Sequence, residues 1–100
     1  MEFLKNFNFL DNDIEEIIKN NSNNVINNMI LCKEEIQDII SYLIEIGIEH
    51  LTIKEIFIYQ VGLFFKTKDE IKKSFDEYEL DSIVKSLNYD VNNIELIDFV

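Results

Sequence analysis

The chain has 100 residues, which is the size of one domain and enough to bury a core. Apolar residues make up 47% and aromatic residues 12%, a globular rather than a disordered composition. The formal net charge of −11 disfavours binding to nucleic acid phosphates or to an anionic membrane surface, and it favours a basic partner. The many isoleucines and asparagines are typical of the codon use of an AT-rich genome.

The location of the protein is suggested by three features of the chain. Cys32 is the only cysteine, so no internal disulfide can form and a reducing compartment fits. The N-terminal segment MEFLKNFNFLDNDIEE lacks the apolar core of a signal peptide. No apolar run approaches the roughly 20 residues that a membrane span needs. We therefore expect a cytoplasmic protein without membrane contact.

The first predicted helix follows Asp13, which forms a loose capping box with Glu16: each side chain accepts a hydrogen bond from a backbone N–H at the helix start. The apolar residues of this helix are Ile14, Ile17 and Ile18. The run DNDIEE also looks like the start of a calcium loop, but Ser22 stands where such a loop ends in glutamate. Helix capping is the better explanation for Asp11 and Asp13.

The clearest helical pattern runs from about Lys33 to Ile46. Apolar residues recur there at helical spacing and form one stripe: Ile36, Ile39, Ile40 and Leu43. Gly47 stands where a glycine in the left-handed conformation would end the helix. The opposite face is acidic and is extended beyond the glycine; its carboxylates are Glu34, Asp38, Glu45 and Glu49.

The next predicted helix begins at Thr52, which forms a capping box with Glu55. The segment IFIYQVGLFF, residues 56–65, could be a strand by composition, because isoleucine and phenylalanine favour strands. The cap and the helical spacing favour a helix, which Gly62 is expected to interrupt. The sequence contains few hairpin signals, because it has only two glycines and no Asn-Gly or Asp-Gly pair.

The remaining caps predict short helices. Thr67 forms a capping box with Glu70, Asp81 precedes another helix, and Asp90 precedes one or two final turns. The whole pattern predicts an all-α fold, either a small bundle or a short helical-repeat array of about six to eight short helices.

A shift of 39 residues aligns Asp13 with Thr52 and brings the following apolar residues into register. This alignment predicts two and a half repeats, at about residues 3–41, 42–79 and 80–100 within one domain. Chance is the alternative explanation, because amphipathic helices in an isoleucine-rich chain align easily.

The segment IISYLIEIGIEHLTIKEIF, residues 39–57, resembles the repeat of the mitochondrial transcription termination factor (MTERF) family. The matching positions are Leu43, Ile46, Gly47, Ile48 and Ile53. The resemblance implies a helical solenoid of about 30 to 40 residues per unit. The family usually has a proline where Val61 or Ser22 stands, and its DNA-binding members present a basic groove. The resemblance therefore implies the architecture and not the DNA binding.

No motif predicts catalysis. His50, the only histidine, falls in a predicted turn, and Cys32 has no second histidine with which to form a catalytic set. We interpret Cys32 as a half-buried small apolar residue. The chain has no Cys-x-x-Cys, no metal-binding histidine pair and no glycine-rich phosphate loop. Composition alone leaves carboxylate-pair chemistry open, but we predict no enzyme, no cofactor and no metal site.

The leading functional hypothesis is a non-catalytic acidic helical module that binds a basic protein partner through Glu34, Asp38, Glu45 and Glu49. Inhibitors, immunity proteins, anti-CRISPR proteins and adaptors are analogues in size and charge alone. The alternatives are an MTERF-like repeat that binds nucleic acid and a structural homo-oligomer subunit. An apolar groove near Phe57, Phe64 and Phe65 is a second candidate docking place. The lysines at 66, 68, 72 and 73 are interpreted as a solvated face.

Overall fold

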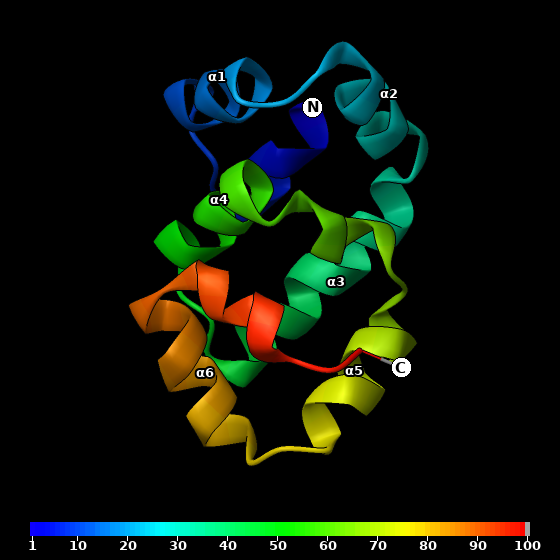
Figure 1. Cartoon of the computed structure of the whole chain (residues 1–100). Helices are drawn as coiled ribbons and strands as arrows, with labels where there is room; N and C mark the ends of the chain where they lie inside the picture. Colours follow the sequence, from blue (N-terminus) through cyan, green and yellow to red (C-terminus); the bar gives the residue numbers. More distant parts are fainter. Residues whose placement is uncertain (100) are drawn as a thin grey trace.

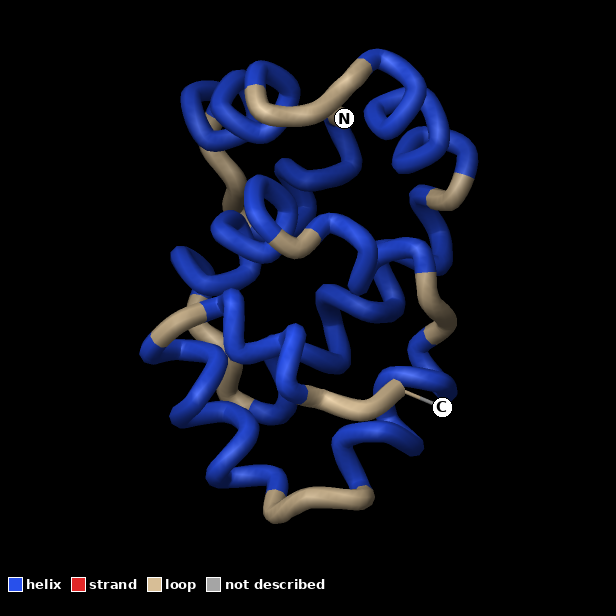
Figure 2. Tube along the Cα trace, in the orientation of Figure 1, coloured by secondary structure: helices blue, strands red, loops and turns tan. Residues whose placement is uncertain are grey.

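The computed structural model describes residues 1–99, and every regular element in this range is helical (Figures 1 and 2). The predicted all-α fold class is confirmed. The described residues form six α-helices and three short 3-10 helices, which are labelled η. Their bounds are η1 Glu2–Phe7, α1 Asp11–Lys19, α2 Asn23–Leu31, α3 Lys33–Ile46, α4 His50–Tyr59, η2 Val61–Phe65, α5 Lys68–Asp76, α6 Leu80–Tyr89 and η3 Val91–Leu96.

Helix α3 is the centre of the fold (Figure 1). Helices α2, α4 and α5 pack against it, as do η1 and η2. Its predicted apolar stripe is fully buried: Ile36, Ile39, Ile40 and Leu43. Gly47 follows the helix with a φ of 107°, the left-handed conformation that a side chain would strain. The predicted bounds and terminator of this helix are therefore confirmed.

The lengths of elements and turns recur along the chain. Three residues separate η1 from α1, α3 from α4, and α5 from α6. A shift of 39 residues carries the start of α1 onto the start of α4, and a shift of 30 carries α4 and η2 onto the starts of α6 and η3. The predicted repeat boundary between residues 41 and 42 nevertheless falls inside α3, and the division into repeats stays a prediction.

Three predicted helix starts are wrong in position. Helix α1 begins at Asp11, so Asp13 lies within its first turn instead of preceding it. Helix α4 begins at His50, and Thr52 is a buried residue of its first turn. Helix α6 begins one residue before Asp81.

A side chain from α6 holds the turn that precedes α4. The side-chain oxygen of Asn88 accepts a hydrogen bond of 2.9 Å from the backbone N–H of Glu49, the residue before the helix. The side-chain amide of Asn88 donates one of 3.1 Å to the carbonyl of Gly47. A residue of α6 thus fixes the turn that leads into α4, and the local Thr52 cap is not used.

The other two caps are confirmed. The Thr67 hydroxyl accepts a hydrogen bond of 3.1 Å from the N–H of Glu70 at the start of α5. The Asp90 carboxylate accepts one of 2.9 Å from the N–H of Asn92, which begins η3. The segment 56–65 is helical as predicted; α4 ends before Gln60, and η2 contains the predicted interrupter Gly62.

The prediction of an apolar groove lined by Phe57, Phe64 and Phe65 is wrong. The rings of Phe57 and Phe64 stack with centroids 3.8 Å apart, and both side chains are buried in the core. The 3-10 turn that follows α4 brings Phe64 back over Phe57, which closes the space that a partner would need. Only Phe65 is exposed.

We expect Leu43→Ala to lower the free energy of unfolding by about 2 to 5 kcal/mol, because it removes a fully buried side chain from the central helix. Urea denaturation followed by circular dichroism measures the change. Leu31→Ala is the matched control, since Leu31 is 82% exposed and its truncation should change stability by under about 0.5 kcal/mol. Equal losses in the two variants would show that the α3 stripe is not the core.

Candidate interaction surface

The predicted acidic face lies on the solvent side of α3. Glu34, Asp38 and Glu45 are all exposed, and their spacing on an ideal helix places them within about 40° of one another around the axis. Glu49 is also exposed and follows across the turn, at the residue before α4. The central helix thus carries the core stripe on one side and carboxylates on the other.

The carboxylates of this face are not neutralised by lysines. In the part of the chain that the structure describes, none of the four acidic residues takes part in an ion pair. The neighbouring Glu35 has a different role, because its carboxylate accepts a hydrogen bond of 3.0 Å from the backbone N–H of Lys68 at the start of α5. Of these two adjacent glutamates, Glu35 therefore stabilises the start of α5, whereas Glu34 remains in the exposed acidic face.

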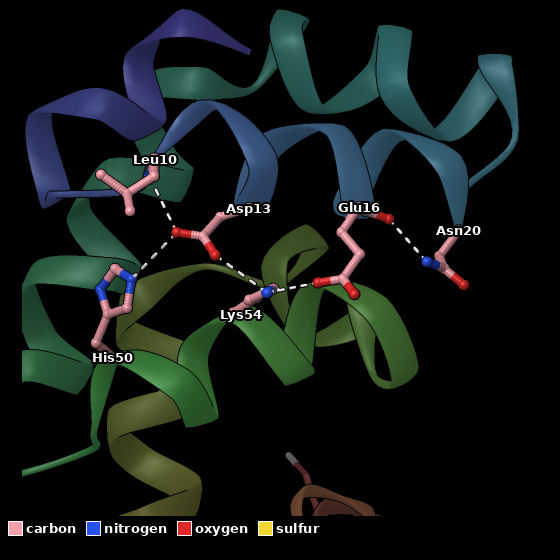
Figure 3. Close-up of polar contacts among 6 residues, drawn as sticks. All are labelled: Leu10, Asp13, Glu16, Asn20, His50 and Lys54. Atoms are coloured by element: carbon pink, nitrogen blue, oxygen red, sulfur yellow. Dashed lines mark hydrogen bonds and ion pairs between the residues drawn. The ribbon is translucent and has the colours of Figure 1, made fainter.

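Three of the five ion pairs among the described residues lie where α1 meets α4 (Figure 3), and the other two join Lys5 to Glu2 and Asp11. Asp13 accepts a hydrogen bond of 3.0 Å from the backbone N–H of Leu10, and its other oxygen lies 3.0 Å from Nζ of Lys54. Lys54 also pairs with Glu16. His50 Nε2 is 3.8 Å from the Asp13 carboxylate, and the imidazole packs on the Phe9 ring with centroids 4.5 Å apart.

Asp13, Glu16, His50 and Lys54 form one group, the Asp13 cluster. The pKa values of Asp13 and Lys54 in this cluster are shifted. The backbone hydrogen bond from Leu10 lowers the pKa of Asp13, and the nearby Lys54 lowers it further. The hydrogen bonds to Glu16 and then to Asp13 raise the pKa of Lys54. The negative charge of Asp13 and the positive charge of Lys54 each favour the charged form of the other, and their ion pair joins α1 to α4.

This cluster was not predicted from the sequence, because Lys54 lies 41 residues from Asp13 and no local pattern pairs them. The one signal in the sequence was the alignment of Asp13 with Thr52, which lies two residues before Lys54. That alignment predicts that α1 and α4 hold equivalent positions in successive repeats.

The other candidate chemical residues remain separate. Cys32 is exposed at the junction of α2 and α3, so its interpretation as a half-buried residue is wrong. Among residues 1–99, no group of three or more His, Cys, Asp and Glu side chains is placed to hold a metal ion. In the lysine cluster, Lys66 lies over the Phe99 ring, 4.6 Å from its centroid, while Lys68, Lys72 and Lys73 are exposed.

Comparisons with protein-family models, with curated proteins and with solved structures gave no match to this chain. Within the described residues, no helix combines the length and the apolar character that crossing a bilayer requires. The surface of the molecule is therefore the basis for its proposed function.

We expect Asp13→Asn to lower the free energy of unfolding by about 1 kcal/mol at pH 7, because the variant loses the charge that Lys54 and the Leu10 N–H stabilise. An aspartate with a lowered pKa stabilises the fold above its ordinary pKa of about 3.9, and this contribution disappears as the pH falls through the folded-state pKa. The difference between variant and parent should therefore shrink from pH 5 down to pH 2.

Urea denaturation across this pH range measures the difference. Asp11→Asn is the control, because Asp11 forms only an exposed pair with Lys5 and should contribute little. A penalty for Asp13→Asn that is the same at every pH would show that packing, rather than charge, explains it.

Proposed function

We propose that the protein is a non-catalytic acidic helical module that binds a basic protein partner. The observation that carries the proposal is the set of exposed carboxylates, Glu34, Asp38 and Glu45, that project from one side of the central helix without a lysine partner. Glu49 extends this surface. Because the other side of α3 is packed into the core, the backbone positions that carry these carboxylates are fixed relative to one another.

The net charge of −11 supports the same proposal. A field of one sign raises the rate at which an oppositely charged partner arrives, and salt weakens the effect. Such a partner could be a nucleic-acid-binding protein or a toxin whose basic surface the module covers, which is how an inhibitor or immunity protein would act. An adaptor would use the same surface without blocking an activity.

A second candidate is an MTERF-like helical repeat that binds nucleic acid. It is favoured by the recurring lengths of helices and turns, since α4 with η2 and α6 with η3 have the same spacing. The charge opposes it, because the exposed lysines of α5 are few and are accompanied by Asp69 and Glu70.

Reversal of Glu34, Asp38 and Glu45 to lysine should slow association with the partner at low salt and remove most of the salt dependence of the association rate. The partner is first obtained by pull-down from the host, and the rates are measured by stopped-flow fluorescence. The control reverses Glu2, Glu15 and Asp69, which are exposed residues of three different elements, and so produces the same net charge. Equal rates for the two triple variants would contradict a docking role for the α3 face.

The parent protein should show no measurable affinity for double-stranded DNA at physiological salt, because four lysines cannot offset the surrounding carboxylates. Fluorescence anisotropy with a labelled duplex measures the binding. A micromolar complex that weakens as salt rises, and that is lost in Lys68→Glu, would instead support the MTERF-like alternative.

A further inference from the structure

A pocket of about 390 Å³ opens on the surface where α6 meets η3. Its lining includes Tyr78, Ile83, Ser86, Leu87, Asn93 and Leu96. Ile83 and Leu87 are buried members of the core, so the pocket reaches down to the apolar interior. In contrast to these buried residues, Leu96 is 77% exposed. An apolar pocket bordered by an exposed leucine can bury apolar surface on binding.

The same position in the preceding pair of helices is filled. A shift of 30 residues relates α4 and η2 to α6 and η3, and it places Ser86 at the position of Ile56 and Asn93 at that of Leu63. Ile56 and Leu63 are buried, whereas Ser86 and Asn93 are partly exposed and line the pocket. The exchange of large apolar side chains for smaller or polar ones accompanies the opening of this space.

Hydrogen bonds hold the walls of the pocket in place. The Asn93 side-chain amide donates a hydrogen bond of 3.0 Å to the carbonyl of Ser86, which ties η3 to α6. The Tyr78 hydroxyl accepts one of 3.2 Å from the N–H of Asp98, which ties the end of the described chain to the turn before α6. A pocket with fixed walls loses less freedom when it is filled than a loose one would.

The segment that builds the pocket carries just over half of the net negative charge of the chain. Residues 76–98 contain seven acidic residues and one lysine, a net charge of −6 out of −11. All seven are exposed, and none of them forms an ion pair in the part of the chain that the structure describes. They are Asp76, Glu77, Glu79, Asp81, Asp90, Glu95 and Asp98.

We infer that this pocket receives a large apolar side chain from a basic segment of a partner protein. The inference rests on the proposed function and adds a specific point of attachment. Charge decides between the possible occupants: a second copy of this chain would bring its own excess of carboxylates, and an anionic lipid surface would be repelled. A segment with lysine or arginine on both sides of an apolar residue matches the pocket, which Glu79 lines, and the negative charge of the segment that builds it.

Synthetic peptides provide the probe. The first is a short fluorescein-labelled peptide of lysine and alanine with one central phenylalanine; the second has alanine in place of phenylalanine, and the third has glutamate in place of lysine. Fluorescence anisotropy gives the affinity of each for the full chain. The phenylalanine peptide should bind about tenfold more tightly than the alanine peptide, the order expected for burial of a large apolar side chain, and the glutamate peptide should not bind.

Two variants assign the preference to the pocket. Leu96→Ser removes an exposed border residue without disturbing the core and should abolish the preference for phenylalanine. Leu31→Ser makes the same change at an equally exposed leucine at the end of α2 and should leave it intact. Ser86→Phe, which fills the pocket from α6, should also abolish it. Circular dichroism verifies that each variant folds.

The outcomes separate the inference from the proposed function. If the phenylalanine and alanine peptides bind equally, and the triple reversal on α3 weakens both, the pocket inference fails while the acidic module stands. If the glutamate peptide binds as tightly as the basic one, the basic nature of the partner fails and with it both proposals. A preference for phenylalanine that survives both Leu96→Ser and Ser86→Phe also overturns the inference.

Discussion

The burial of one side of α3 is the interaction on which the rest of the molecule depends. Five other elements pack against this helix, and its four apolar stripe residues have no access to water. Because that side is fixed in the core, the opposite side must face solvent, and its carboxylates take positions set by the helix geometry. The helix ends at Gly47, whose left-handed conformation stops it, and hydrogen bonds with Asn88 fix the turn from which α4 departs. The acidic surface is thus a consequence of how the core forms.

Side-chain amides supply the second level of organisation. Asn88 holds both sides of the turn between α3 and α4. Asn21 donates hydrogen bonds to the carbonyls of Ile17 and Phe57, at 2.8 and 3.0 Å, and so joins the end of α1 to the end of α4. Short helices leave many backbone groups without partners at their ends, and an asparagine carries both the donor and the acceptor that such groups need. Several asparagines that codon use appeared to explain therefore have structural roles.

Local rules in the sequence predicted what depends on neighbouring residues and missed what depends on distant ones. The stripe of Ile36, Ile39, Ile40 and Leu43 and the stop at Gly47 were predictable, because period and glycine conformation act within a single helix. The start of α4 was not predictable, because the helix begins two residues before Thr52 and the turn before it is held by Asn88, 39 residues along the chain from Glu49. The acidic face follows from α3 alone and could be placed from its spacing. The α6–η3 pocket could not, because its walls come from residues 78–97 that only tertiary packing brings together.

Charge is distributed unevenly over the molecule, and this distribution bears on how a partner would be recognised. In the Asp13 cluster, carboxylates and Lys54 compensate each other, and the result is a fixed contact between two helices. Toward the C-terminal end of the described chain the compensation is missing, so the folded state carries an electrostatic repulsion that balanced charges would remove. A basic partner would relieve this repulsion at the moment of binding. Charge of this kind acts at long range and mainly sets how fast a partner arrives, whereas an apolar pocket acts only at contact and sets how long it stays. A surface that combines the two can select a partner by the pattern of its side chains as well as by its charge.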